Sequence, residues 1–466
     1  MSNVFYQNSV ILTGETVDLK RQLGVYTGVF IIVADMIGTG IFMTTGNLLG
    51  MTGNAVTVLV LWGIGGIVAL TGSLCYAELA TMWPDVGGEY VYLKKTFGPL
   101  PAFLTGWISL VVGFSAPVAT SSLLVAQYFN RFMHGLAADP AAPQALDSLW
   151  AQKGVAACVV VFFALIHIVG VKKGGYFQNF LTVLKILLVV SFILFGFVMV
   201  DWSSAGRLTA DYRPAGQEAV GIPVLGLALL IVMFAYSGWN GAVYIAGEIK
   251  NPERNLPRIL FTGTLVTTAL YLLLNVVFLL SSPGGDIMGK DEIGAIAGRS
   301  LFGPGVSAFF TLGIAVILLS AVSVQTMIGP RVYYAMAKDG LMFRSLASIH
   351  PRFETPALSI VIQMALALLY VFTGSAMTLV IYMGFALNIY PVLTVVGLIY
   401  LRKKHPGIRR PYRVPLYPLV PVLYITLTLA MMTAALMNWT TTSLFAIGVL
   451  ALGVPVFYLW RRVVRK

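Results

Sequence analysis

The sequence predicts an all-α integral membrane protein, and three observations lead to that fold class. Of the 466 residues, 58% are hydrophobic and only 10% are charged, whereas a soluble domain carries about 25% charged residues. The apolar residues form long runs that do not alternate with polar ones, which argues against transmembrane β-strands of about ten residues. Lys and Arg, finally, are concentrated in every second connection between the runs.

Each apolar run is long enough for a helix that crosses the hydrocarbon core, which takes about 20 residues. We expect twelve transmembrane helices, near 25–50, 55–80, 98–129, 154–171, 177–200, 222–247, 258–281, 303–337, 356–373, 376–401, 417–437 and 441–460. No long linker separates these runs, so they predict a single membrane domain.

The positive charges predict the orientation of the spans. With the N-terminus in the cytoplasm, 23 of the 30 Lys and Arg residues fall in cytoplasmic segments, six in outer segments and one, Lys185, inside a span. Cytoplasmic loops of membrane proteins carry such an excess. We therefore expect a multi-pass protein of the cell inner membrane with both termini in the cytoplasm. The net charge of +12 is then explained by topology, and no nucleic-acid partner is expected.

Two predicted spans contain small and polar residues where a membrane helix normally continues. The first has Met-Ile-Gly-Thr-Gly-Ile-Phe at 36–42 and the sixth has Phe-Ala-Tyr-Ser-Gly-Trp-Asn at 234–240. Non-helical backbone survives at membrane depth only where it is buried in protein or lines a cavity, and paired interruptions of this kind indicate a transporter site. We expect helices 1 and 6 to be broken at mid-membrane, with close helix packing through small residues as the alternative.

These motifs and others in the same order resemble the amino acid–polyamine–organocation superfamily, and within it the bacterial relatives of the L-type amino acid transporter branch. The likeness covers about residues 20–425. Besides the two interrupted spans, it rests on Tyr-Ala-Glu-Leu (76–79), Pro-Asp-Val-Gly-Gly-Glu-Tyr-Val-Tyr-Leu (84–93), Gly-Glu-Ile-Lys-Asn-Pro-Glu-Arg-Asn-Leu-Pro (247–257), Arg-Val-Tyr-Tyr-Ala-Met-Ala-Lys-Asp-Gly (331–340) and Arg-Pro-Tyr-Arg-Val-Pro (410–415).

The resemblance implies a leucine-transporter-type fold, in which two inverted repeats of five helices are followed by two C-terminal helices. It divides the chain into a cytoplasmic N-terminal segment (1–24), a transport core (25–401), and a cytoplasmic loop with helices 11 and 12 (402–466). The repeats of the core would lie at about 25–200 and 222–401.

The function implied is that of a sodium-independent secondary transporter that moves amino acids, above all neutral ones, by alternating access. Exchange (antiport), facilitated diffusion and proton symport stay open as modes. A carrier of cationic amino acids or polyamines is the alternative within the class, and a substrate-sensing membrane receptor on the same fold is the alternative outside it.

The resemblance also places the substrate at the two breaks. The backbone N–H groups of Thr39 and Gly40 would hold the substrate carboxylate, and the carbonyl groups of Met36, Phe234 and Ser237 would take its ammonium group. Broken helix ends expose such groups and carry the partial charges that suit a zwitterion. The full expected substrate-binding set is Met36, Gly38, Thr39, Gly40, Phe234, Ala235, Ser237, Gly238, Trp239 and Asn240.

Three side chains of the second motif would shape this site. Phe234 would close over the substrate as an aromatic gate, and Trp239 and Asn240 would border the pocket for its side chain. For the two aromatic residues, packing against lipid or core is the alternative.

Lys185 and Asp35 are the expected coupling residues. Lys185 lies about 12 Å into the fifth span, so it should face the bundle interior with a partner. It matches the lysine that sodium-independent relatives place where sodium-coupled ones bind Na⁺. The resemblance implies contacts with the broken backbone of span 1 and with a hydroxyl of span 8, Ser320 or Ser323. Asp35 departs from the family pattern and has three open roles: a hydrogen-bonded structural group, a proton-coupling site, or a counter-ion for a cationic substrate.

Three further polar residues have simpler expected roles. Glu78 and Glu248 lie at cytoplasmic span ends and are expected to pair with nearby Lys or Arg. His167, alone in the fourth span, is expected to be a packing residue.

Other classes of protein lack support in the sequence. Both cysteines, Cys75 and Cys158, fall inside spans, so neither a disulfide nor a metal site nor a cofactor is expected. The outer segment 130–153 contains no cysteine, which argues against a disulfide-linked heavy chain. Four histidines without a His-Glu-x-x-His motif do not indicate an enzyme. The expected partners are an amino acid, the lipid bilayer and, as a further candidate, protons.

Overall fold

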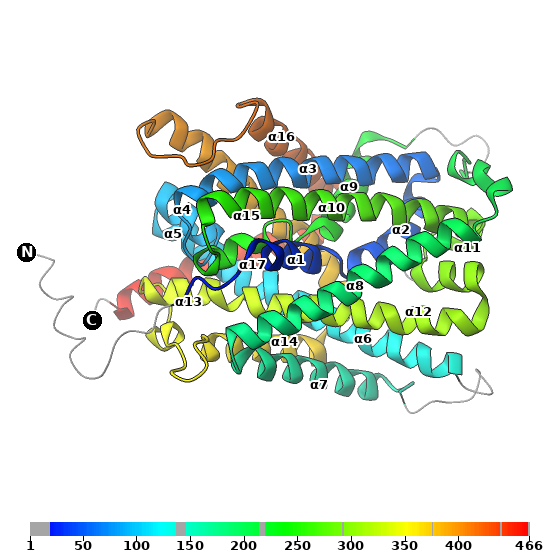
Figure 1. Cartoon of the computed structure of the whole chain (residues 1–466). Helices are drawn as coiled ribbons and strands as arrows, with labels where there is room; N and C mark the ends of the chain where they lie inside the picture. Colours follow the sequence, from blue (N-terminus) through cyan, green and yellow to red (C-terminus); the bar gives the residue numbers. More distant parts are fainter. Residues whose placement is uncertain are drawn as a thin grey trace, which may run out of the picture.

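The computed structural model describes residues 19–136, 146–213, 220–290, 293–374, 376–438 and 440–464. Within these ranges the chain is helical and has no strand, only two isolated β-bridges. Most of the long helices run side by side in one bundle (Figure 1). Residues 1–18 of the expected cytoplasmic segment lie outside the described residues.

Ten helical runs are long and apolar enough to cross a membrane, and an eleventh is a bent pair. The ten are α3 (Ala55–Met82), α5 (Pro99–Ile108) through η1 (Ser109–Phe114) to α6 (Ser115–Leu136), α7 (Leu149–Ile168), α8 (Val171–Met199), α9 (Ile222–Tyr236) to η3 (Gly241–Glu248), α10 (Pro252–Ser281), α12 (Ile293–Ile328) to α13 (Pro330–Lys338), α15 (Ala376–Lys404), α16 (Leu419–Asn438) and α17 (Thr440–Val464). The bent pair is α1 (Val25–Met36) with α2 (Thr39–Thr52). The prediction of an all-helical membrane protein is confirmed.

The remaining elements are short. They are α4 (Glu89–Phe97), η2 (Trp202–Leu208), α11 (Gly284–Ile287), η4 (Arg344–Ala347) and α14 (Ala357–Thr373). The apolar helix α14 occupies the predicted span 356–373 but has only 17 residues. It packs against α6 and α7.

The first interruption separates α1 from α2, whose axes differ by 40°. Ile37 is extended (φ −73°, ψ 91°) and Gly38 adopts φ −138°, ψ −140°, so neither continues the helix. The chain resumes its helical path at Thr39. The main chain therefore turns within the Met-Ile-Gly-Thr-Gly motif.

The second interruption separates α9 from η3, a tighter 3₁₀-helix. Ser237 is extended and Gly238 has a φ of +100°, a conformation that glycine adopts at low cost. A Cβ atom on Gly238 would lie only 2.7 Å from Cγ of Asp35. Glycine is thus required there both by the backbone angle and by the close approach of α1.

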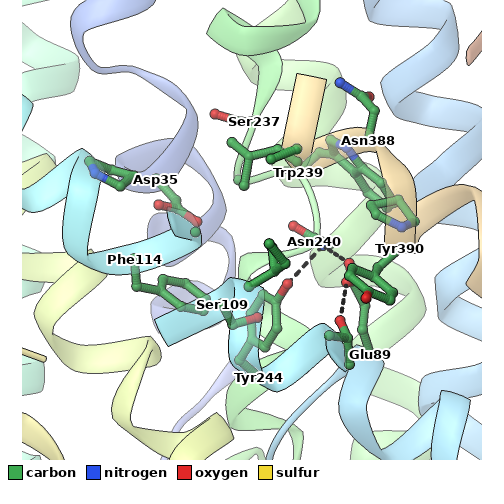
Figure 2. Close-up of a pocket in the computed structure, with 18 of the residues that line it drawn as sticks. Asp35, Glu89, Ser109, Phe114, Ser237, Trp239, Asn240, Tyr244, Asn388 and Tyr390 are labelled. Carbon is green, nitrogen blue, oxygen red and sulfur yellow. Dashed lines mark hydrogen bonds between the residues drawn. The ribbon is translucent and has the colours of Figure 1, made fainter. Parts of the chain in front are cut away.

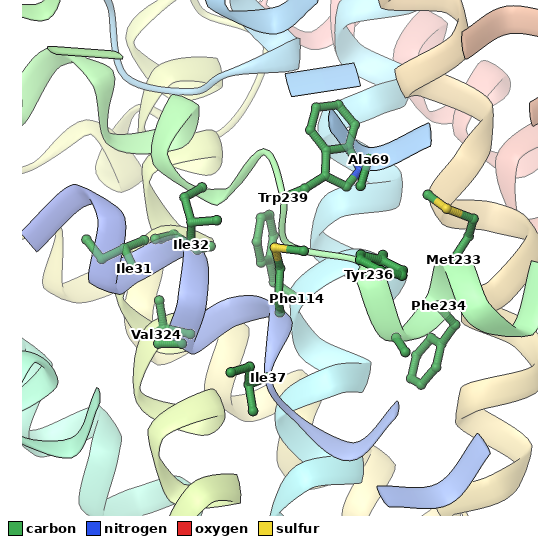
Figure 3. Close-up of a cluster of buried hydrophobic side chains, with 14 of the residues drawn as sticks. Ile31, Ile32, Ile37, Ala69, Phe114, Met233, Phe234, Tyr236, Trp239 and Val324 are labelled. Atoms are coloured by element: carbon green, nitrogen blue, oxygen red, sulfur yellow. The ribbon is translucent and has the colours of Figure 1, made fainter. Parts of the chain in front are cut away.

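Small residues let the interrupted helix α1 pack closely on α10. A Cβ on Gly28 would lie 2.4 Å from Ile259, and one on Gly263 would lie 2.6 Å from Ile32. Helices in lipid associate through such close packing, because lipid tails remove the hydrophobic drive between them. Figure 3 shows Ile32 of α1 and Val324 of α12 among the buried side chains beside the first break. The breaks are therefore enclosed by packed helices.

Candidate functional site

A central cavity of about 80 Å³ lies at the second break. Residues of α1, α4, α9, η3, α15 and α16 contribute to its wall, among them Asp35, Glu89, Trp239, Asn240 and Tyr244 (Figure 2). A smaller cavity of about 30 Å³ lies beside the start of α2. Both cavities are lined by Asp35, Pro117, Phe234, Ser237 and Gln325, so they lie next to each other.

The start of α2 faces the smaller cavity with unsatisfied donors. Gly38, Thr39 and Gly40 line this cavity, and Gly38, the N-cap residue, provides no side-chain cap. The first N–H groups of a helix lack intrahelical partners and attract anions. A Cβ on Gly40 would lie 2.4 Å from Cα of Ala235, so glycine allows α2 and α9 to meet here. The arrangement can hold a carboxylate.

The carbonyl groups at the breaks already have partners within the chain. The hydroxyl of Tyr271 lies 2.5 Å from the carbonyl oxygen of Met36 and 2.9 Å from that of Ala235. The carbonyl oxygen of Phe234 accepts from both the amide N (3.1 Å) and Oγ (2.7 Å) of Ser237. Because a carbonyl oxygen has two lone pairs, that of Phe234 is saturated. The carbonyl of Met36 is therefore the better candidate for a substrate ammonium group.

The ammonium group of Lys185 lies at the first break, completely buried. Its Nζ donates to the carbonyl oxygens of Ala34 (2.8 Å) and Ile37 (2.5 Å). The expected contact with the interrupted backbone of the first span is thus present. Lys185 fixes two carbonyl groups that the end of α1 leaves free.

The expected hydroxyl contact of Lys185 is corrected by the structure. Ser320 Oγ accepts from Gln178 at 3.3 Å, and Ser323 Oγ shares a hydrogen bond of 2.9 Å with Nε2 of His167. Each serine on α12 is thus engaged by a polar side chain of α8 or α7. One helical residue turns a side chain by about 100°, so the face of α12 could not be fixed to this precision from sequence. His167 is buried and hydrogen-bonded, as expected of a packing residue.

Asp35 joins the two breaks. Its Oδ1 accepts a hydrogen bond from the amide of Gln325 on α12. Its Oδ2 would lie 2.8 Å from a Cβ on Gly241, so the carboxylate packs directly on η3. Lys185 is the cation with which Asp35 interacts electrostatically. Asp35 therefore has both a hydrogen-bond donor and a counter-charge inside the protein.

Glu89 is a cavity residue that the sequence analysis did not single out. The chain folds back after α3, and α4 begins with Glu89 at the wall of the central cavity. Its Oε1 accepts from the hydroxyl of Tyr76 (2.8 Å) and from Nδ2 of Asn240 (2.7 Å), and Thr105 lies 3.4 Å from Oε2. Burial, partly opposed by these hydrogen bonds, raises the pKa of the Glu89 carboxyl to about 7. The one available signal was a carboxylate directly after two glycines in the 84–93 motif.

The aromatic residues of the second motif take different positions. Trp239 packs edge-on against Tyr76 (4.7 Å between ring centroids) and Tyr424 (5.9 Å), and it lines the central cavity. Phe234 is buried and lines both cavities. Asn240 donates to Glu89 and to the hydroxyl of Tyr244 at 3.1 Å (Figure 2).

The segment before α1 and the end of η3 are joined by main-chain bonds. The amides of Gln22 and Leu23 donate to the carbonyl of Glu248, each at 2.9 Å, and the amide of Lys250 donates to the carbonyl of Leu23 at 2.9 Å. The Glu248 side chain accepts from Nε of Arg331 at 2.8 Å, with both side chains buried. The segment before α1, the end of η3 and α13 therefore form one connected closure.

Glu78 has a comparable set of partners. It accepts from Nε of Arg402 at 2.9 Å, lies 3.3 Å from Nε of Arg410, and accepts from the amide of Val414 at 2.7 Å. The expected pairing of Glu78 and Glu248 with arginines is confirmed.

A bundle of membrane-spanning helices around an internal cavity, with uncapped helix ends facing that cavity, defines a multi-pass membrane transporter. The chain belongs to the amino acid permease family, whose match covers residues 23–459.

Named relatives of the chain are transporters and exchangers of amino acids. The serine/threonine exchanger SteT of Bacillus subtilis is 30% identical over 446 residues, which cover 94% of this chain and 97% of the relative. The b(0,+)-type amino acid transporter 1 of Homo sapiens is 30% identical over 427 residues, covering 92% and 85%. The cystine/glutamate transporter of Homo sapiens is 28% identical over 448 residues, covering 96% and 86%.

Proposed function

We propose that this protein is a sodium-independent amino acid transporter that binds its substrate between the two helix breaks. The observation that carries the proposal is the uncapped start of α2, whose glycine-rich turn faces a cavity. The carboxylate of the substrate would bind the N–H groups of Thr39 and Gly40, and its ammonium group would lie near the carbonyl of Met36 and near Asp35. Ser237, Gly238 and the aromatic Phe234 would border the bound amino acid.

The position of Lys185 supports sodium independence. Its ammonium group already donates hydrogen bonds to the carbonyl oxygens of Ala34 and Ile37. A small cation at this place would need those same oxygen atoms as ligands. A fixed internal charge in this position takes over the structural role of a bound ion. The hydrogen bond from Gln325 and the charge of Lys185 favour a structural role for Asp35.

The transport cycle that we propose is alternating access with twelve spans, α14 included, in the inner membrane and with cytoplasmic termini. The two five-helix repeats would begin with the two interrupted spans. The cytoplasmic closure around Glu248 and Arg331 would be the inner gate. The outer gate would be the turn at Gly289, whose amide donates to the carbonyl of Gly46 on α2 at 2.8 Å.

Exchange is the mode that we place first, with small neutral amino acids as reference substrates. Support comes from the Bacillus subtilis relative, whose name specifies exchange of serine and threonine. Facilitated diffusion and proton symport are the competing modes.

Proteoliposomes test this function. Vesicles preloaded with L-serine or left empty receive labelled L-serine outside, in Na⁺ or choline buffer, with and without a pH gradient. We expect uptake that needs internal serine and is equal in the two buffers. Loss of uptake in choline buffer would overturn sodium independence. Uptake into empty vesicles that is driven by a proton gradient would show symport instead of exchange. Binding of serine without uptake would favour a receptor.

A further inference from the structure

The buried carboxylates of the described chain differ in one respect, which is whether a cation compensates them. Asp35, Glu78, Glu89 and Glu248 are buried. Asp35 interacts with Lys185, Glu78 pairs with Arg402 and Arg410, and Glu248 pairs with Arg331. Among the described residues, Glu89 has no cationic partner within salt-bridge distance, and its hydrogen-bond donors are all neutral.

An uncompensated buried carboxylate is costly unless something else neutralises it. Glu89 lies at the wall of the central cavity, so a bound ligand can do so. In Figure 2 Glu89 lies across the cavity from Asp35, with Asn240 between Glu89 and Tyr244. A ligand held at the breaks by its α-carboxylate and α-ammonium groups would therefore extend its side chain toward Glu89.

The surroundings of Glu89 are also those of a cation site. The rings of Phe114, Trp239, Tyr244, Tyr390 and Tyr424 line the same cavity. Aromatic faces attract ammonium and guanidinium groups, Trp and Tyr most strongly, and the attraction grows when water is excluded. Both the carboxylate and the rings thus favour positive charge.

We propose that the Glu89 end of the central cavity is a subsite for the cationic side chain of a basic amino acid, an ammonium or a guanidinium group. The inference rests on the proposed function and narrows its substrate class. The backbone breaks bind the zwitterionic part, which carries no net charge. Glu89 then supplies the single negative charge that balances a side chain of charge +1.

The same residue also lets neutral substrates enter. The titratable groups that interact electrostatically with Glu89 are tyrosines of α3, α4, η3, α15 and α16: Tyr76, Tyr92, Tyr244, Tyr390 and Tyr424. Since burial raises its pKa to about 7, the carboxyl group is protonated in a substantial fraction of molecules at neutral pH. A protonated Glu89 leaves no unpaired charge beside a neutral side chain.

Competition in proteoliposomes tests the proposal. Labelled L-serine uptake is measured against unlabelled L-arginine and against L-citrulline, a near-isosteric neutral analogue. For the wild-type protein we expect arginine to compete at least tenfold more strongly than citrulline. Equal competition overturns the proposal and needs no variant. Absence of serine uptake in the wild type would instead contradict the proposed function.

Variants then assign the preference to Glu89. Glu89→Gln should lose the preference for arginine over citrulline about tenfold, with both competitions measured relative to the variant's own serine uptake, while Glu89→Asp should retain part of the preference. Glu253→Gln is the matched control, because Glu253 is exposed and pairs with Arg409 on the surface. An unchanged arginine preference in Glu89→Gln would overturn the proposal. The proposal would also be overturned if Glu89→Gln lost only the response of uptake to a pH gradient, because Glu89 would then be a proton site.

Discussion

Nζ of Lys185 lies 2.5 Å from the carbonyl oxygen of Ile37, the residue that directly follows α1. A side chain from α8 thus completes the hydrogen bonding of an interrupted helix more than a hundred residues away in sequence. Because Lys185 also balances the charge of Asp35, the first break depends on it both for hydrogen bonds and for charge.

Replacing Lys185 should damage the break itself. Lys185→Met leaves two buried carbonyl groups without a donor and Asp35 without a counter-charge, a change that costs about 3–5 kcal/mol. We expect a lower midpoint of thermal unfolding in detergent and loss of serine uptake. Lys20→Met, which removes an exposed surface ion pair with Glu354, should change neither. Wild-type stability in Lys185→Met would show that the ammonium group is dispensable.

Gly40 should tolerate no side chain. The Cβ of alanine at this position would lie 2.4 Å from the backbone of Ala235, so α2 and α9 would have to separate. We expect Gly40→Ala to abolish serine uptake although alanine favours helix. In Gly63→Ala, where nothing lies within 4 Å of the new Cβ, uptake should match the wild type. Uptake measured in both variants at equal protein density decides the point, and normal uptake in Gly40→Ala would refute the tight contact.

The hydroxyl of Tyr271 should stabilise the contact between the breaks. Tyr271→Phe removes the donor shared by the carbonyls of Met36 and Ala235, and an unsatisfied buried group costs about 1–3 kcal/mol. We expect a lower unfolding midpoint in detergent and slower serine exchange. Tyr26→Phe is the control, since Tyr26 is 82% exposed. If both variants unfold at the same temperature, the shared hydrogen bond contributes nothing.

Arginine recognition should depend on pH. A carboxyl whose pKa is raised to about 7 is mostly protonated at pH 6 and mostly ionised at pH 8. The cationic side chain binds the ionised form, so competition by arginine should strengthen by roughly tenfold between these values. Citrulline competition should stay level, and so should arginine competition in Glu89→Gln. Arginine competition that weakens as the pH rises would contradict this assignment.

Much of this architecture could be predicted from the sequence, for physical reasons that differ between its parts. Apolar runs of about 20 residues predict spanning helices. The glycines at 38, 40 and 238 indicate where the two breaks lie, and at 40 and 238 the structure leaves no room for a side chain. Lys185 could be assigned to the interior since a deep lysine needs a partner.

Other parts of the site depend on information that the sequence does not carry locally. Glu89 reaches the cavity only because the chain folds back before α4. The partners of Ser320 and Ser323 depend on the rotation of α12. Tyr271 lies in an apolar helix, where nothing distinguishes a hydroxyl that bridges two backbone breaks from one that packs against a neighbour.

The main-chain bonds that join Leu23 to Glu248 and Lys250 couple the segment before α1 to the end of η3. We expect the two segments to move together because these bonds join them. The ion pair between Arg331 and Glu248 also attaches these two segments to α13. In the proposed transport cycle, opening toward the cytoplasm would therefore require the buried pair of Arg331 and Glu248 to separate before these two segments could leave α13.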